Sequence, residues 1–235
     1  ALLGANIVLM ARNEDKLKEV IKTLDSSKGQ THAYLVADFS QPANVKLAIE
    51  KFTEAKKIAH ILINNTGGPA GGAALTAGTD EYLQAFNSHL ICNHILVQAL
   101  VEGMKVAGFG RIINIISTSV KQPLAGLGVS NTIRAAVANW SKTLATELGP
   151  FGITVNNVLP GFTQTVRADY VIDKKVLDTG KTKEDVMAAL VKEIPVGRIG
   201  KAEEFGAAVA FLASPAAAYI NGINLPVDGG RLTSL

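Results

Sequence analysis

The stretch from Gly110 to Gly161 constrains the fold more than any other part of the chain. It begins with the apolar run G-R-I-I-N-I-I, which ends in the hydroxyl residues S-T-S. A long apolar pattern with helical spacing follows, and then a second β-branched run, G-I-T-V-N-N-V-L, which closes on P-G. This order predicts a strand, a helix and a strand, with functional side chains at the carboxyl end of the first strand. Open α/β sheets bind their ligands at that end.

The same stretch resembles the core of the short-chain dehydrogenase/reductase family. In that family a serine follows the strand, a Y-x-x-x-K motif starts the next helix, and a V-N-x-V-x-P-G pattern comes after it. Ser117 stands at the position of the family serine, Ser130 at that of the tyrosine and Arg134 at that of the lysine. The resemblance implies an α/β fold of the Rossmann type, with a doubly wound parallel sheet, as a single dinucleotide-binding domain over residues 1–235.

Composition excludes several other classes of protein. The chain of 235 residues is 48% hydrophobic and 18% charged, which is typical of one globular domain and not of a disordered chain. Its net charge of +3 is spread over scattered basic residues, so no nucleic-acid partner is indicated.

Features of the chain that bear on its compartment favour the cytoplasm. Cys92 is the only cysteine, so no intrachain disulfide can form, as is usual in a reducing compartment. The first residues, A-L-L-G, lack the basic region of a signal peptide. No apolar run reaches the roughly 18 residues that a membrane span requires. We therefore expect a cytoplasmic protein with no membrane partner.

Two residues near the start of the chain are candidates for binding the adenosine half of a cofactor. Arg12 follows the predicted strand Asn6–Ala11, where the family uses a basic residue to bind the 2′-phosphate of NADP. The alternative is a solvated charge at the start of a helix that Asn13 would cap. Asp38 ends the next predicted strand and matches the family aspartate that binds the adenine amino group. It could instead cap the helix that begins near Pro42.

The sequence H-I-L-I-N-N-T-G, which ends at Gly67, resembles the N-N-A-G motif of the family. Asn64 and Asn65 carry amides that can tie neighbouring loops together, and Gly67 allows the backbone to approach a cofactor. Thr66 replaces the alanine of the motif. The wider run G-G-P-A-G-G lacks the G-K-[ST] of a phosphate-binding loop, so we interpret it as a flexible loop.

A long helix is predicted from about Glu81 to Val106, capped by Thr79-Asp80. Asn87 lies where the family has a fourth catalytic residue, an asparagine that helps to hold a proton-relay water. His89 and His94 lie on the same helix. Their spacing does not suit a metal pair and no third ligand is evident, so we expect packing or interface roles and no metal site.

Pro160, Gly161 and Thr165 match the family pattern P-G-x-x-x-T, whose last residue contacts the cofactor. The more polar segment of about residues 162–196 resembles a mobile lid over the substrate, and Thr182 starts a helix there with a capping box.

The family opens with a strand and a T-G-x-x-x-G-I-G turn, which holds the cofactor pyrophosphate at a helix N-terminus. Ala1 to Asn6 resembles the end of the helix that follows this turn. The preceding strand would lie at the centre of the sheet, between Asn6–Ala11 and His60–Thr66. Without it, unpaired backbone groups would cost about 1–3 kcal/mol each, so we expect about 20 further residues before Ala1.

Three function classes remain open at this stage. The first is an NADP-dependent carbonyl reductase, since the S-N-T-x-R wording resembles a branch labelled as 3-oxoacyl-[acyl-carrier-protein] reductases. Ser130 cannot replace a phenol with a pKa of about 10, so a proton would come from Lys121, from Tyr170 or from a water near Asn87. The second class is a cofactor-binding sensor or partner subunit with little turnover. The third is a hydrolase, although Ser117 lacks a G-x-S-x-G elbow.

The apolar faces of two predicted helices also indicate self-association. The helices over residues 131–148 and 203–213 carry more apolar and small residues than one buried face needs. We expect a homo-oligomer, and the resemblance implies a tetramer.

Overall fold

The computed structural model describes residues 1–234, and the side chains of Val166 and Arg167, inside the predicted lid, lie outside the described part. The strands are β1 (Val8–Ala11), β2 (Ala33–Val36), β3 (Ile61–Asn64), β4 (Gly110–Ile115), β5 (Ile153–Pro160) and β6 (Asn224–Val227). The α-helices are α1 (Glu14–Thr23), α2 (Pro42–Glu54), α3 (Thr79–Phe86), α4 (Cys92–Ala107), α5 (Gly128–Leu148), α6 (Val166–Thr179), α7 (Lys183–Lys192) and α8 (Ala202–Ala213).

The strands are parallel and fall into two sheets. β1 pairs with β2, and β3, β4, β5 and β6 form a four-stranded sheet in that order. Among the described strands, no pairing joins the two sheets, and a further strand between β1 and β3 was expected from the sequence. The predicted α/β class with parallel strands is confirmed.

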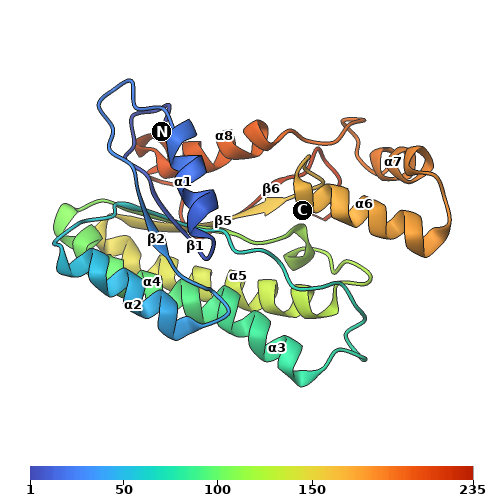
Figure 1. The fold of residues 1–235 in the computed structure, drawn as a ribbon, viewed down its shortest axis with the longest axis horizontal. Coiled ribbons are helices and arrows are strands. Elements are labelled where there is room, and N and C mark those ends of the chain that lie inside the picture. The colour runs from blue at the N-terminus through green and yellow to red at the C-terminus, as the bar shows by residue number, and fades with distance from the viewer. Residues whose placement is uncertain (235) are drawn as a thin grey trace.

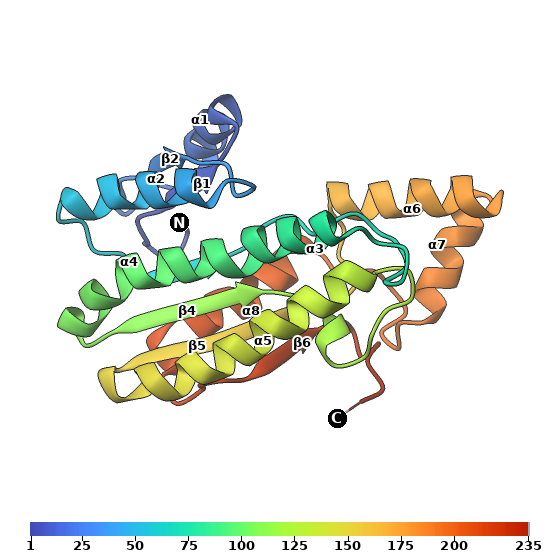
Figure 2. The same ribbon diagram turned by 90° about the horizontal axis from the view of Figure 1, so that it is seen from below.

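Helices cover both faces of the strands (Figures 1 and 2). α4 and α5 pack on β4 and β5 from one side, and α2 packs against α4. α8 packs on the same two strands from the other side, and α1 lies against β1 and β2. α6 and α7 project at one end of the molecule, beside the carboxyl end of the four-stranded sheet (Figure 1).

The central strands are buried on both faces because alternate residues enter different cores. Ile112 belongs to the core beneath α2, α4 and α5, whereas its neighbour Ile113 packs beneath α8. Val155 and Val158 of β5 divide in the same way. This alternation explains why β4 and β5 are buried along almost their whole length, as strands covered on both sides are.

The sequence pattern predicted two of the helix N-caps correctly and a third incorrectly. Asn13 caps α1 by accepting a hydrogen bond from the Lys16 N–H at 2.9 Å, as predicted. Thr182 likewise caps α7, with the Asp185 N–H at 3.1 Å. The predicted cap at Thr79-Asp80 is wrong, because Gly78 is the N-cap residue and its own N–H donates to Glu81.

The long helix predicted after Thr79 is interrupted by a π-helical segment, Asn87–Ile91, between α3 and α4. The whole stretch Thr79–Ala107 is long and apolar enough to cross a membrane by length and composition. The expectation that no segment of the chain would pass that test is therefore wrong. A core helix of a soluble protein passes the same test, and α4 lies between α2 and β4.

Candidate active site

Arg134 is a buried cation at the carboxyl ends of two neighbouring strands. Its side chain is 7% exposed, and its guanidinium donates to the Ile115 carbonyl of β4 at 3.0 Å and to the Thr66 carbonyl after β3 at 3.3 Å. Burial lowers its pKa to about 10, so it stays charged at neutral pH. Among the described side chains, no carboxylate forms an ion pair with it.

Two residues hold the loop that meets this guanidinium. The Thr66 hydroxyl shares a hydrogen bond with Nδ1 of His89, which is 2% exposed within the π-helical segment. Burial and the nearby charge of Arg134 lower the pKa of His89 to about 3, so the imidazole is neutral at pH 7. Sequence reasoning expected a packing or interface role for His89 but did not connect it with Thr66. The replacement of the family alanine by Thr66 was the one signal that pointed to it.

Ser117 lies two residues beyond the carbonyl that Arg134 contacts. Its backbone is extended and its Oγ accepts a hydrogen bond from the Ser119 N–H at 3.0 Å, which starts the short 3₁₀ turn Thr118–Val120. This turn packs against α5. The half-buried Ser117 hydroxyl is thereby held at the end of β4.

Ser130 lies in the first turn of α5, four residues before Arg134, so the two side chains share one face of the helix. The start of α5 is fixed by its contact with the loop after β3. The Gly128 N–H donates to the Gly72 carbonyl at 2.9 Å, and a Cβ on Gly128 would lie 2.4 Å from the Ala74 backbone. Only glycine permits this approach. The helix α5 begins at Gly128, earlier than the sequence pattern indicated.

Asn87 is the first residue of the π-helical segment, and its carbonyl accepts from the Cys92 N–H. Such segments are rare and often lie at functional sites. The segment packs against α5, the helix that carries Ser130 and Arg134. That Asn87 and Ser117 face one cleft with these two residues stays a prediction.

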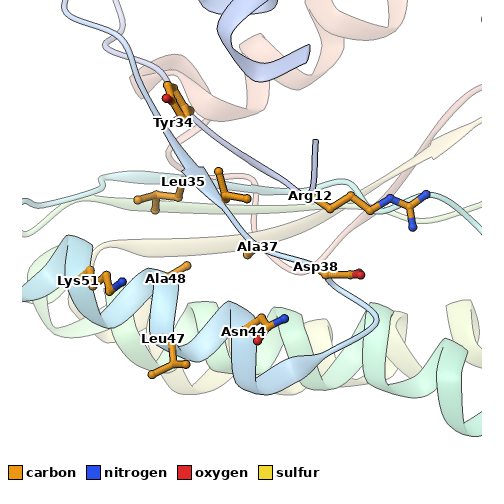
Figure 3. A pocket seen from close by; sticks show the side chains of 10 residues that line it. Arg12, Tyr34, Leu35, Ala37, Asp38, Asn44, Leu47, Ala48 and Lys51 are labelled. Carbon is orange, nitrogen blue, oxygen red and sulfur yellow. The ribbon is translucent and has the colours of Figure 1, made fainter. Parts of the chain in front are cut away.

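Arg12 and Asp38 line a second region, a cavity of about 740 Å³ beside β2 and α2 (Figure 3). The Asp38 carboxylate accepts from the Ser40 N–H at 2.9 Å. This bond, the Ser40 hydroxyl and the charge of Arg12 lower the pKa of Asp38. Asp38 is not the N-cap of α2, since Gln41 occupies that position.

The residues after β3 differ in what they can reach. Asn64 is buried and donates to the Asn114 side chain at 2.8 Å, whereas Asn65 is exposed. Gly67 is also exposed, and a Cβ on it would meet nothing within 4 Å. Asn65 and Gly67 thus face open space, while Asn64 belongs to the sheet.

The residues of the predicted P-G-x-x-x-T pattern lie at the end of β5 and in the segment that follows it. Pro160 ends the strand. A Cβ on Gly161 would lie 2.4 Å from Cα of Asp228, so packing alone requires glycine there. Thr165 is exposed and caps α6 by accepting from the Ala168 N–H at 3.3 Å.

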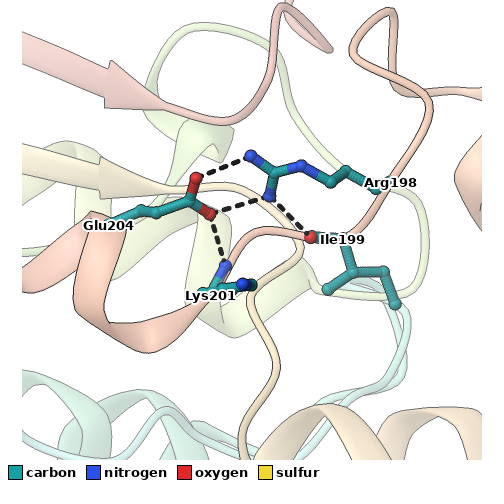
Figure 4. Close-up of polar contacts among 4 residues, drawn as sticks. All are labelled: Arg198, Ile199, Lys201 and Glu204. Carbon is teal, nitrogen blue, oxygen red and sulfur yellow. Dashed lines mark hydrogen bonds and ion pairs between the residues drawn. The ribbon is translucent and has the colours of Figure 1, made fainter.

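The helices α6 and α7 form an excursion whose two ends are tied together. The Gly200 N–H donates to the Phe162 carbonyl at 3.0 Å, and the Gln164 N–H donates to the Gly200 carbonyl at 2.8 Å. Beyond this base, Arg198 makes two hydrogen bonds to Glu204, at 2.8 and 2.6 Å, at the start of α8 (Figure 4).

Comparison with known proteins identifies the family. A family model described as "Enoyl-(Acyl carrier protein) reductase" matches residues 1–231. The 3-oxoacyl-[acyl-carrier-protein] reductase FabG of Pseudomonas aeruginosa is 33% identical, over 99% of this chain and 89% of its own length. The chain belongs to the short-chain dehydrogenase/reductase family. This family consists of NAD(P)-dependent oxidoreductases.

Two further relatives are described together with NADPH. The NADPH-dependent reductase BacG of Bacillus subtilis is 28% identical, over 98% of this chain and 89% of its own length. The structure of L-sorbose reductase from Gluconobacter frateurii, complexed with NADPH and L-sorbose, superposes with a TM-score of 0.91 at 30% identity. It covers 99% of this chain and 89% of that one.

His89 and His94 pack against other side chains in the described structure. His89 is buried against Thr66, and the His94 ring packs edge-on against Trp140 with centroids 6.2 Å apart. Within residues 1–234, no group of three or more His, Cys, Asp or Glu side chains could hold a metal ion.

Proposed function

We propose that this chain is an NADP-dependent reductase of a small carbonyl compound, such as a 3-oxoacyl thioester or another ketone. Arg134 would take the role that lysine has in the family motif. The observation that carries the proposal is the buried, unneutralised guanidinium at the ends of β3 and β4. A buried cation without a counterion is costly, and an electron-rich ligand at that place would offset the cost.

The residues present fit a dinucleotide. Arg12 would bind the 2′-phosphate and Asp38 the adenine amino group, since both line one cavity. Arg134 would hold ribose hydroxyls, and the exposed Asn65 and Gly67 leave room beside it. The part of the site that would hold the nicotinamide would be shaped by Asn64, Pro160, Gly161 and Thr165. NADPH, when bound, would supply the hydride.

The chain's own groups would then handle charge and proton. Ser117 would orient the substrate carbonyl, and Arg134 would stabilise negative charge on its oxygen. His89 cannot be the acid at neutral pH, because with a pKa of about 3 its imidazole is neutral there and has no acidic proton to donate. Ser130 is not acidic enough, so a water near Asn87, Lys121 or Tyr170 would deliver the proton.

The decisive experiment is NADPH consumption against a panel of carbonyl compounds that includes 3-oxoacyl thioesters, sugars and simple ketones. We expect oxidation of NADPH with at least one compound, and loss of that rate in Arg134→Ala. The matched variant Arg12→Asp should weaken NADPH binding and spare NADH. Tight NADPH binding without oxidation by any compound would contradict the catalytic part of the proposal.

That contrary outcome describes the second candidate function, a cofactor-binding sensor or partner subunit. The pair Ser130 and Arg134, in place of tyrosine and lysine, favours it. Restoring both family residues, in Ser130→Tyr with Arg134→Lys, tests the point. We expect this double variant to gain carbonyl reduction, and no gain at any substrate would favour the sensor.

We also propose a cytoplasmic homotetramer. Phe211 of α8 remains 47% exposed, and Trp140 of α5 and His94 of α4 are half-buried. Burial of such apolar surface would stabilise association. Sedimentation at micromolar concentration tests it, and a monomer there would contradict it.

A further inference from the structure

Four asparagines stand side by side across the four-stranded sheet. Asn64 of β3 is in register with Asn114 of β4, Asn114 with Asn157 of β5, and Asn157 with Asn224 of β6. Their side chains bond in the same order. Each Nδ2 donates to the Oδ1 of the next residue, at 2.8, 3.2 and 2.8 Å from Asn64 onward.

This row is connected to α5 through one hydroxyl. The second N–H of the Asn114 amide donates to Oγ of Ser141 at 2.9 Å, and Ser141 in turn donates to the Val137 carbonyl at 2.7 Å. Asn114 and Ser141 are both 0% exposed. Asn114 therefore uses both amide protons and its carbonyl, and Ser141 uses its proton and a lone pair.

The hydroxyl of Ser141 lies on the helix face that carries the candidate site. Ser130, Arg134, Val137 and Ser141 are spaced by four, three and four residues, which places them along one side of α5. Arg134 contacts the carbonyl of Ile115, and Ser141 contacts the side chain of Asn114, the preceding residue of β4. Arg134 and Ser141, which make these two contacts, lie about two turns apart on α5, or about 10 Å along its axis.

We propose that Ser141 and Asn114 are positioning residues, which fix the height and rotation of α5 on the sheet and so hold Arg134 at the strand ends. Apolar packing alone permits a helix to slide by fractions of a turn, because dispersion contacts are not directional. A slide of α5 would move the Ser141 hydroxyl away from the buried Asn114 amide, and the loss of this hydrogen bond would cost free energy. The inference rests on the proposed function only in using NADPH affinity as one of its measures.

The test is a double-mutant cycle between Ser141→Ala and Arg134→Ala. If Ser141 acts through Arg134, Ser141→Ala should weaken NADPH binding about three- to tenfold in the native background. In the Arg134→Ala background the same change should cost less than about twofold, since the group it positions is gone. Equal losses in both backgrounds would overturn the proposal, because they would show a general effect on the fold.

A control on α5 separates the sheet contact from helix stability. Thr143→Ala removes a hydroxyl that donates to the Asn139 carbonyl at 3.2 Å on the exposed side of the helix. We expect it to leave NADPH affinity unchanged. Ile112→Val, in the core beneath α5, controls for a modest loss of stability. A loss of affinity in Ile112→Val equal to that in Ser141→Ala would also overturn the proposal.

A second measurement does not depend on the cofactor. Amide hydrogen exchange over residues 128–136 should rise in Ser141→Ala and stay unchanged in Thr143→Ala. Failure of the native protein to bind NADPH would refute the proposed function alone, and the exchange comparison would still decide the role of Ser141. Equal exchange in the two variants would refute that role.

Discussion

β5 and β1 are both parallel strands of mainly apolar residues, yet they differ greatly in burial. Every residue of β5 before Pro160 is buried, whereas Val8 of β1 is 41% exposed and the rest of that strand is half-buried. β5 has strands on both edges, α5 on one face and α8 on the other. Among the described elements, β1 pairs with β2 only. Neighbours, rather than hydrophobicity, determine how deeply a strand is buried.

The same contrast applies to charged groups. Arg12, after β1, is exposed to water, and the Tyr34 hydroxyl of β2 meets Glu14 at the surface. Arg134, at the end of the four-stranded sheet, is surrounded by protein and meets only carbonyl oxygens among the described groups. The two regions therefore offer a ligand two kinds of cation, one screened by solvent and one not.

Among these predictions, the largest effect is the loss of folding stability in acid that the buried His89 should cause. His89 has a pKa of about 3 in the folded protein, against 6.5 ordinarily. As the pH falls from 6.5 to 3, the unfolded chain binds a proton that the folded chain does not, so stability decreases. The loss would be on the order of 5 kcal/mol over the whole window.

Urea denaturation of the native protein and of His89→Gln across this pH range measures the effect. We expect the difference in unfolding free energy between the two to shrink as the pH falls. A difference that stays constant from pH 7 to pH 4 would show that His89 is not kept neutral by its surroundings.

The same substitution made in both regions sharpens the comparison of the strands. Val155 of β5 is 0% exposed and Val36 of β2 is 46% exposed. Val155→Ala should lower the free energy of unfolding by about 2–3 kcal/mol, through lost burial and the cavity left behind. Val36→Ala should cost less than about 1 kcal/mol. Equal costs would mean that β2 is as well covered as β5.

A smaller effect is expected from salt, which should change the contribution of Arg12 to NADPH affinity more than that of Arg134. Raising the salt concentration from about 0.05 to 0.5 M shortens the Debye length severalfold. The loss of NADPH affinity in Arg12→Ala should therefore shrink a few-fold at high salt, and the loss in Arg134→Ala should hardly change. Fluorescence titration with NADPH measures both, and equal salt sensitivity would contradict the assignment of Arg134 to a water-excluded site.

The smallest effect is expected at the start of α8. Arg198 and the Lys201 N–H lower the pKa of Glu204 to about 2. The stability from this carboxylate is therefore present above its ordinary pKa of 4.5 and lost as the pH falls from 4.5 to 2. Glu204→Gln should speed amide exchange in the first turn of α8 at neutral pH, and the exposed neighbour Glu203→Gln should not. Equal exchange in both would show that the pair contributes nothing.

Much of the fold could be predicted because strand and helix periods are local properties. The apolar runs at β4 and β5 identified both strands, and Asn13 and Thr182 identified two helix starts. The π-helical segment at Asn87–Ile91 could not be predicted, since one extra residue in a helical turn leaves the apolar pattern almost unchanged. Likewise, the need for glycine at position 128 arises from its close approach to Ala74, which lies far away in the sequence.

The candidate site divides in a similar way. Motif spacing was enough to single out Arg134, and the structure places it at the ends of β3 and β4. The bond between Thr66 and His89 joins residues 23 positions apart, so no local pattern could show it. The partners of Asn114 come from two strands and a helix, and only the register of the sheet brings them together.

The thiol of Cys92 can report motion of the β1–β2 layer relative to α4. This residue begins α4, and its thiol donates to the carbonyl of Phe39, just after β2, at 3.3 Å. It is 0% exposed, and burial raises its pKa to about 11, so an aromatic disulfide reagent should react with it only when the surrounding structure opens. As the sequence contains no other cysteine, the rate at which one equivalent of reagent is consumed measures how often the β1–β2 layer lifts from α4. Labelling with and without NADPH would show whether a ligand holds the two layers together.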